Sequence, residues 1–183
     1  MASTSIETAR LRLDRWSEPH TPLLVQLSSV PSVVRYIGLG MPWPQSKAEE
    51  ISAAQRGHWN EHEFGWRAAV EKTSARHVGL MALNFVGPGT AGLDPSEYEI
   101  GWWLEPSIWG RGFAREGGEA LCAEAFDSLA APSVVARIQP ENARSICVAE
   151  ALGFALDFET TDEVGEPIGV YRLMAAERPR PPG

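Results

Sequence analysis

The sequence has few of the residues that build disulfide frameworks or structural zinc sites. Its 183 residues include two cysteines, Cys122 and Cys147, which form no CxxC pair, and four histidines. Small disulfide-rich scaffolds and zinc sites need more cysteines, at characteristic spacings. We therefore expect no disulfide framework and no metal in the site.

Positive charge and long apolar runs are also scarce. The chain has 16 Lys and Arg against 24 Asp and Glu, a formal net charge of −8. Binding phosphates non-specifically needs a basic surface, so no nucleic-acid partner is expected. No run of about 18 apolar residues is present, and residues 1–13 lack the apolar region of a signal peptide. We therefore expect no membrane partner and a cytoplasmic location.

The composition that remains is that of an ordinary globular chain, with 44% hydrophobic and 22% charged residues. This length suits one domain. We expect a single domain over residues 1–183, with its core at about 6–175 and a Pro-rich tail at 178–183. Seven tryptophans are many for this length. Some should pack in the core and others should line a pocket, since indole has a large apolar face and one donor.

Hydrophobic periodicity predicts strands and helices in an order typical of an α+β fold. Ser46 and Glu49 match a capping box at the start of one of the helices. Strands are predicted at residues 10–14, 64–70, 76–85, 98–104, 134–139, 154–160 and 170–174, and helices at 19–29, 31–36, 46–62, 112–129 and 143–152. This order predicts a mixed sheet with helices packed on it.

Residues 109–114, Trp-Gly-Arg-Gly-Phe-Ala, form a glycine-rich link between a strand and a helix. Two glycines let the backbone approach a bulky anion, and a helix N-terminus presents unpaired N–H groups. Arg111 adds a side-chain donor for phosphate. The pattern indicates a pyrophosphate site. Taken alone, the pattern fits a turn that only joins two elements equally well. It matches neither the GxGxxG motif of dinucleotide-binding proteins nor a P-loop.

Two flanking segments narrow the interpretation. The strand before the loop reads YEIGWWLEP at residues 98–106, and the segment after it reads PENARSICVAEALGF at residues 140–154. With residues 8–13, these segments resemble the GNAT superfamily of acetyl-CoA-dependent N-acetyltransferases, and its RimJ/RimL-like branch in particular. The resemblance covers about residues 6–175. It implies the GNAT fold, with a mostly antiparallel central sheet splayed at the cofactor site and helices on both faces.

The resemblance also implies an activity. Acetyl-CoA would donate an acetyl group to a primary amine of a protein N-terminus or a small molecule, by direct attack in a ternary complex. A non-catalytic acyl-CoA-binding or ligand-sequestering module on the same fold is an alternative, and a nucleotide-binding protein is a weaker one. Homodimer formation is left open.

Cofactor contacts follow from the resemblance residue by residue. Trp109 stands where Gln or Arg is usual in the superfamily, a departure that is also common in its RimJ/RimL-like branch. The pyrophosphate would be bound by the loop residues Gly110, Arg111, Gly112, Phe113, Ala114 and Arg115. The pantetheine arm would be bound by Trp103, Leu104 and Glu105. Asn142 would also contact the cofactor arm. Asn142 is also among the best residues for a helix N-cap, and both roles are compatible.

The tyrosine that many family members place before Gly-Phe, to protonate the leaving thiolate, is absent here. Ser145 matches the serine that the RimJ/RimL-like branch places earlier on the helix, although it would otherwise bond to its own helix backbone. Cys147, two positions on, is expected in the core rather than as a nucleophile.

Direct attack needs a neutral amine, so a group must accept a proton, directly or through water. Glu99 is the first candidate, because strand alternation places it on one face with Trp103. A carboxylate beside apolar tryptophans would be a stronger base. Facing solvent or pairing with an arginine is the alternative, and Glu105 is the second candidate.

The early part of the chain is expected to bind the acceptor, by analogy with related proteins. Trp43, Trp59 and Trp66 are the predicted acceptor-binding residues. His58 and His62 have a helical spacing that suits metal binding, but no third ligand is apparent. A solvated helix face is therefore the preferred interpretation of these histidines.

Overall fold

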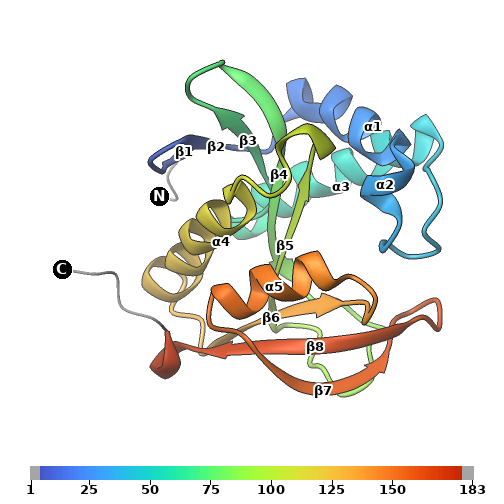
Figure 1. The fold of residues 1–183 in the computed structure, drawn as a ribbon, viewed down its shortest axis with the longest axis vertical. Coiled ribbons are helices and arrows are strands. Elements are labelled where there is room, and N and C mark those ends of the chain that lie inside the picture. The colour runs from blue at the N-terminus through green and yellow to red at the C-terminus, as the bar shows by residue number, and fades with distance from the viewer. Residues whose placement is uncertain (1–4, 179–183) are drawn as a thin grey trace.

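The computed structural model describes residues 5–178, and they form one eight-stranded sheet with the order β1-β2-β3-β4-β5-β6-β8-β7 (Figure 1). All neighbouring strands are antiparallel except β5 and β6, which are parallel. The strands are β1 (Ser5–Glu7), β2 (Leu11–Arg15), β3 (Arg67–Glu71), β4 (Arg76–Phe85), β5 (Tyr98–Leu104), β6 (Ser133–Ile138), β7 (Ala155–Thr161) and β8 (Pro167–Met174). This is the predicted mixed α/β architecture.

The sheet opens between β5 and β6. Their pairing is limited to Tyr98 opposite Val134 and Glu99 opposite Val135, at the start of both strands. Beyond Glu99 the two strands diverge, as Figure 1 shows. The second half of β5 therefore has a sheet partner on its β4 side only. The expected splay is confirmed.

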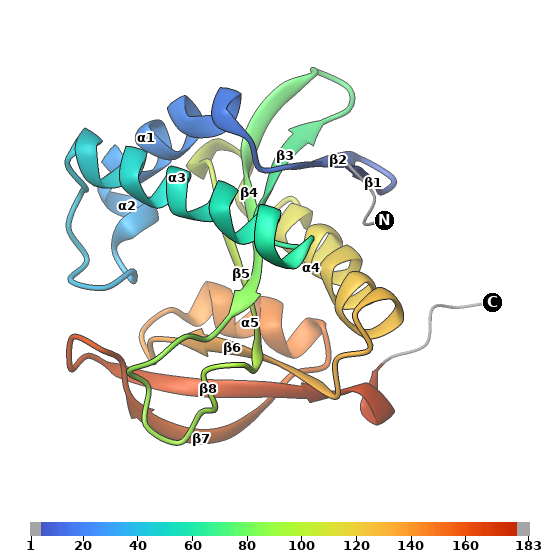
Figure 2. The ribbon, with the colours of Figure 1, turned by 180° about the vertical axis from the view of Figure 1, so that it is seen from behind.

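Helices cover both faces of the sheet, α4 and α5 on the face toward the viewer in Figure 1 and α1 and α3 on the face toward the viewer in Figure 2. The helices are α1 (Thr21–Ser29), α2 (Pro31–Val34), α3 (Gln45–His62), α4 (Phe113–Ala123) and α5 (Ala143–Ala151). Short 3₁₀ turns lie at Glu18–His20, Pro106–Ile108 and Ala175–Glu177, and a π-helical turn at Glu124–Ser128 extends α4.

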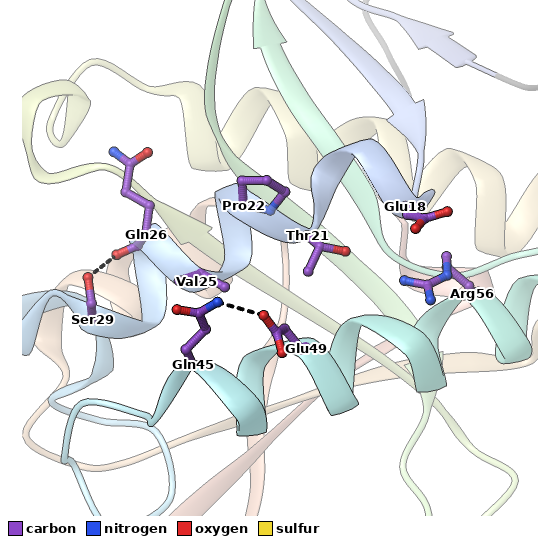
Figure 3. Close-up of a pocket in the computed structure, with 9 residues that line it drawn as sticks. All are labelled: Glu18, Thr21, Pro22, Val25, Gln26, Ser29, Gln45, Glu49 and Arg56. Carbon is purple, nitrogen blue, oxygen red and sulfur yellow. Dashed lines mark hydrogen bonds between the residues drawn. The ribbon is translucent and has the colours of Figure 1, made fainter.

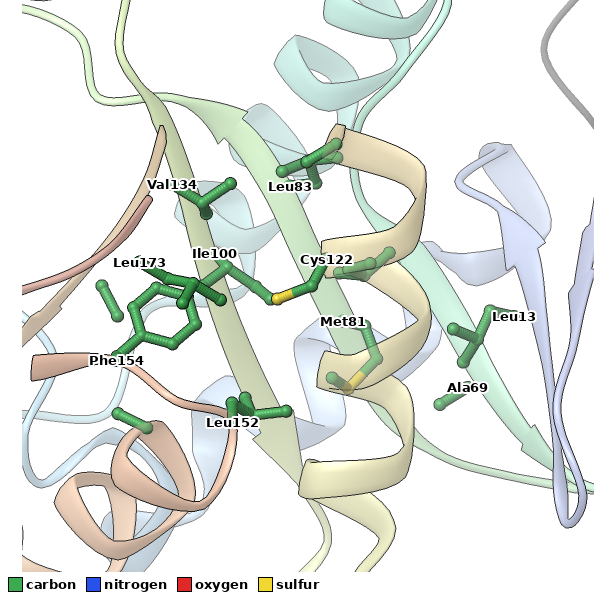
Figure 4. Packing of buried hydrophobic residues seen from close by; sticks show 14 of the residues in the cluster. Leu13, Ala69, Met81, Leu83, Ile100, Cys122, Val134, Leu152, Phe154 and Leu173 are labelled. Atoms are coloured by element: carbon green, nitrogen blue, oxygen red, sulfur yellow. The ribbon is translucent and has the colours of Figure 1, made fainter. Parts of the chain in front are cut away.

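Each face has its own apolar core. The core under α4 and α5 contains Met81, Ile100, Cys122 and Leu152, which Figure 4 shows packed between the sheet and the two helices. The core under α1 and α3 includes Leu24 and several tryptophans. Each fully buried large apolar side chain contributes roughly 1.5–3 kcal/mol relative to an exposed one. These two cores hold the splayed strands at their separation.

Close approach of backbones holds the end of β5 against β4. Gly79, opposite Leu104 in the register, has φ of +155°, a region that L side chains rarely adopt. A Cβ at Gly79 would lie 2.2 Å from the carbonyl oxygen of Trp103. Only glycine therefore permits this contact, which positions residues 103–105 beside the open part of the sheet.

Element boundaries differ from the predicted ones at several places. The predicted capping box at Ser46 is wrong, since α3 begins at Gln45 with Pro44 as its N-cap. Pro44 already has the extended backbone that precedes a helix, so Ser46 falls within the first turn, and Gln45 donates to Glu49 instead (2.7 Å). β1 was not predicted, β3 begins three residues later than expected, and β8 begins three residues earlier. Of the Pro-rich tail at 178–183, residues 179–183 lie outside the described residues.

Candidate functional site

Two left-handed glycines shape the loop between β5 and α4. Gly110 has φ of +76° and Gly112 has φ of +81°, and Gly112 is the N-cap of α4. Side chains are strained in this conformation, whereas glycine is not. The glycines turn the chain from the 3₁₀ turn at Pro106–Ile108 into the first turn of α4, so the backbone of this turn lies at the surface.

The turn presents a row of unsatisfied N–H groups. Within residues 5–178, the amides of Gly110, Gly112, Phe113, Ala114 and Arg115 have no hydrogen-bond acceptor, whereas the amide of Arg111 donates to Ile108 (3.3 Å). A helix N-terminus with free amides favours an anion through both the hydrogen bonds and the helix dipole. Phe113 buries its ring in the core, so its side chain does not cover these amides.

Two arginines beside the loop, Arg10 and Arg111, are each paired with a carboxylate. Arg111 contacts Glu71 (3.1 Å), and Arg10 contacts Glu116 (2.6 Å) while donating to the carbonyl of Arg111 (2.8 Å). Burial alone would raise the pKa of Glu116, but hydrogen bonds from Thr8 and Arg10 outweigh it and hold that pKa below its ordinary value. The guanidinium groups of Arg10 and Arg111 therefore hold the loop in place through their hydrogen bonds and ion pairs.

The end of β5 lies directly before this loop. Leu104 is buried, and its carbonyl accepts a hydrogen bond from the indole of Trp109 (2.8 Å). Glu105 accepts from Gln26 (3.0 Å) and pairs with Arg76 (3.3 Å). Trp103 makes an edge contact with Trp43, with ring centroids 5.1 Å apart. The predicted pantetheine segment thus lies at the opening of the sheet, with Trp103 on the α1 and α3 face.

The N-terminus of α5 faces β5 across the opening. Asn142 caps the helix by accepting from the amide of Ser145 (3.2 Å), as one of its two predicted roles requires. The hydroxyl of Ser145 accepts a hydrogen bond from the indole of Trp102 (3.2 Å). Among the described residues, no acceptor receives the proton of that hydroxyl. The alternative of a hydroxyl bond to its own helix backbone is therefore absent.

Glu99 forms an ion pair. Arg137 of β6 donates to both carboxylate oxygens (2.7 and 3.0 Å), and Asn84 of β4 donates to one of them (3.3 Å). The same guanidinium also contacts Thr90 (2.7 Å) and Glu163 (3.3 Å). Pairing with an arginine, the alternative given for Glu99, is thus what the structure shows. No sequence pattern singled out Arg137, because the pair joins residues 38 positions apart.

The three tryptophans expected at the acceptor occupy different environments. Trp59 is 2% exposed and its indole donates to the carbonyl of Trp66 (2.7 Å), so it is a core residue and the expected acceptor contact is wrong. Trp66 is also buried and donates to Asn84 (3.1 Å). Trp43 is half-buried against Trp103. The accessible aromatic pair is therefore Trp43 and Trp103.

The histidines and cysteines lie in different environments. His58 and His62 have ring centroids 4.6 Å apart, with the ring planes tilted by 58°. His58 is half-buried against Phe64, so the expected solvated helix face is wrong for this residue. Within residues 5–178 no group of three or more His, Cys, Asp or Glu is placed to hold a metal ion. Cys122 is buried, and burial raises the pKa of its thiol to about 12. Cys147 is exposed, so the expectation that it packs in the core is wrong.

A groove of about 640 Å³ lies between α1 and α3 (Figure 3). Most of the residues that line it are polar, among them Glu18, Gln26, Glu49 and Arg56. Gln26 connects the groove to Glu105 at the end of β5. The described residues contain no helix with the length and apolarity needed to cross a bilayer.

The fold and the loop together define a class of protein. A family model described as an acetyltransferase (GNAT) domain matches residues 10–155, and the chain belongs to this family. GNAT enzymes transfer an acetyl group from acetyl-CoA to an amine acceptor. The expected superfamily is thus confirmed, and the pyrophosphate-type loop is the part of the chain at which such a cofactor would be recognised.

Individual relatives agree with this assignment. The chain is 34% identical over 148 residues to an uncharacterized N-acetyltransferase of Bacillus subtilis, YnaD, covering 81% of each chain. The crystal structure of an acetyltransferase from Agrobacterium tumefaciens is similar with a TM-score of 0.78 and 26% identity, covering 94% of this chain and 95% of that one. The structure of RimL, the ribosomal L7/L12 alpha-N-protein acetyltransferase in complex with coenzyme A, shares the fold (TM-score 0.73, 16% identity, 93% and 97% covered).

Proposed function

We propose that this protein transfers the acetyl group of acetyl-CoA to a primary amine, of a protein N-terminus or a small molecule, by direct attack in a ternary complex. The observation that supports it most is the set of free amides at Gly110 and at residues 112–115, beside the unpaired half of β5. These amides would bind the pyrophosphate, and residues 103–105 and Asn142 would contact the rest of the cofactor arm. Ser145 and the loop around Trp109 favour a RimJ/RimL-like enzyme.

Ser145 would supply the proton that the leaving group needs. The amine nitrogen attacks the thioester carbonyl carbon, the C–S bond breaks, and the thiolate of coenzyme A takes the hydroxyl proton of Ser145. Trp102 donates to the hydroxyl oxygen. Among the described residues no acceptor competes for the hydroxyl proton. Solvent then returns a proton to the serine. A thiolate is a good leaving group, so one positioned donor suffices.

Glu99 would accept the proton of the attacking amine, through water. Its carboxylate lies on the same strand face as Trp103, where Trp43 and Trp103 would contact the acceptor. The bidentate pair with Arg137 fixes the orientation of the carboxylate. A fixed carboxylate positions one water molecule better than a mobile one does.

A non-catalytic acyl-CoA-binding or ligand-sequestering module is the second candidate. The ion pairs support it, because Glu99 is held by Arg137 and Glu105 by Arg76, so neither candidate base is free of a cation. Such a module would bind acetyl-CoA through the same loop and would release no coenzyme A.

One assay series separates the candidates. Acetyl-CoA is added to the protein, its melting temperature is recorded, and a thiol reagent detects coenzyme A released with N-terminal peptides, aminoglycosides, polyamines and amino acids. At about 100 times the dissociation constant the ligand adds roughly 2.7 kcal/mol of stability, which raises the melting temperature by several degrees. Stabilisation without release favours the module. Stabilisation by ATP or NAD in place of acetyl-CoA, or by none of them, contradicts both.

Ser145→Ala tests the proton donor. We expect kcat to fall by about 100-fold, the low end for general acid catalysis, with unchanged affinity for acetyl-CoA. Cys147→Ala is the matched control, because it removes an exposed side chain from the same helix. A wild-type kcat for Ser145→Ala would remove the serine from the mechanism.

A further inference from the structure

Arg144, in the first turn of α5, reaches back across the opening of the sheet to the glycine loop. The Cζ atom of its guanidinium lies 4.9 Å from the ring centroid of Trp109, the residue directly before Gly110. Arg144 is exposed, and among the described residues it has no carboxylate partner and no hydrogen bond. Its only described contact is therefore the face of an indole.

The other arginines near the loop are neutralised. Arg10 is paired with Glu116, Arg111 with Glu71, and Arg115 with Glu119 (2.8 Å). Each of these pairs adds a negative charge beside the anion site for every positive one. Arg144 is thus the one guanidinium at this loop, within residues 5–178, whose charge no carboxylate offsets.

Trp109 is built as a rigid support for this cation. Its indole nitrogen donates to the carbonyl of Leu104 (2.8 Å), and its ring packs against the core under α4 and α5. A guanidinium that stacks on an aromatic ring uses its face for the contact and keeps its in-plane N–H donors available. Those donors suit the paired oxygens of a phosphate, which arginine binds in a bidentate manner.

We propose that Arg144, held in place by Trp109, binds a phosphate group of acetyl-CoA and is a determinant of cofactor affinity. The inference rests on the proposed function, since it assigns a further residue to the same cofactor site. Phosphate binding here joins the N-terminus of α5 to the loop before α4 across the opening of the sheet. The cofactor would therefore clamp the two sides of the opening together.

The test is calorimetric titration of the folded protein with acetyl-CoA at low and high salt. We expect Arg144→Gln to weaken binding by about 10-fold, as the loss of a hydrogen bond between charged groups does, and the loss to shrink as salt is raised. Arg115→Gln is the matched control, because it removes an exposed arginine that is already paired, and it should weaken binding less. Arg144→Lys should recover little, since an ammonium neither stacks nor binds phosphate in a bidentate manner.

Trp109→Leu tests the support. It should weaken acetyl-CoA binding as Arg144→Gln does. The double variant should bind acetyl-CoA as tightly as the single variant with the lower affinity, because both substitutions remove the same interaction. A loss that disappears with 3′-dephospho-coenzyme A assigns Arg144 to the 3′-phosphate, and a loss that persists assigns it to the pyrophosphate. Wild-type affinity in Arg144→Gln overturns the inference and leaves the proposed function intact. Failure of the wild-type protein to bind acetyl-CoA overturns the proposed function itself.

Discussion

At the scale of single residues, chemistry here depends on the nearest partner. Glu99 and Glu105 are both carboxylates at the opening of the sheet, and each is held by an arginine from another strand. Ser145 differs, because its one described side-chain contact is an indole donor that leaves its proton free. The proton of the serine therefore has no acceptor among the described residues, whereas each carboxylate already has a cation as partner.

Glu99 and its partner can be separated by mutation. Glu99→Gln keeps the shape of the side chain and should lower kcat by at least about 100-fold if the carboxylate takes the amine proton. Arg137→Gln should lower kcat by a smaller factor, because it keeps the carboxylate and removes only the group that fixes its orientation. Steady-state kinetics of both variants checks this. An unchanged rate in Glu99→Gln would exclude Glu99 as the base.

His20 should make stability depend on pH. Burial lowers its pKa below the ordinary 6.5, and the neighbouring His77 lowers it further. The unfolded chain therefore takes up a proton first as the pH falls, so the contribution of neutral His20 is lost progressively below about pH 6.5. Nδ1 of His20 accepts from the amide of Ser17 (3.0 Å). His20→Asn keeps an acceptor that does not titrate, and urea unfolding between pH 7.5 and pH 5.5 should show a flatter dependence than the wild type. Identical slopes would contradict this.

At the scale of elements, the first turn of α4 and the end of β5 together form the proposed cofactor site. Glycines at 110 and 112 expose the helix amides, and Gly79 lets β4 approach the end of β5. The proposed site depends on the departure of β6 from β5 after Glu99. A fully paired β5 would have no free edge for a ligand.

Gly112→Trp tests the role of the glycine loop in cofactor binding, and Gly165→Trp, in a turn elsewhere in the chain, is the matched control. Both Gly112 and Gly165 have positive φ (+81° and +89°), so tryptophan at either position should cost about 1–2 kcal/mol of stability. Only Gly112→Trp should abolish acetyl-CoA binding, because the side chain fills the approach to the free amides. Thermal unfolding with and without acetyl-CoA measures both effects. Equal affinity in the two variants would contradict the role given to the loop.

At the scale of the whole molecule, a buried ion pair ties the sheet to the end of α4. Arg67 of β3 has no exposed surface, and its Nε atom donates to Glu124 (3.1 Å) in the π-helical turn after α4. The same guanidinium lies 4.8 Å from the ring centroid of Trp59 in α3. Elements on both faces of the sheet therefore meet at one charged residue.

Removing one member of this pair should destabilise the entire chain. Arg67→Met leaves the carboxylate of Glu124 buried without a cation, at a cost of roughly 3–5 kcal/mol. The double variant with Glu124→Leu removes both charges and should recover most of the loss. Urea unfolding gives the free energies of unfolding. A single variant within about 1 kcal/mol of the wild type would show that the pair does not hold the fold together.

The sequence by itself determined the family, the mixed fold and the glycine loop. These features depend on short continuous segments, because strand alternation, a pair of glycines and the start of a helix each involve residues close together in the chain. The core position of Trp59 and the start of α3 at Gln45 were not predictable in this way. Burial depends on what packs from elsewhere, and Pro44 outweighed a local capping pattern.

Only the tertiary structure decided how the site residues are paired. Glu99 meets Arg137 because β5 and β6 are adjacent where their pairing begins, and Trp102 meets Ser145, 43 positions away, because the strands then diverge toward α5. Trp109 and Arg144 lie on opposite sides of the same opening. Contacts between distant segments follow from strand order and divergence, which no local pattern encodes. The glycine loop could therefore be predicted from the sequence, whereas the ion pairs and hydrogen-bond partners of the residues around it could not.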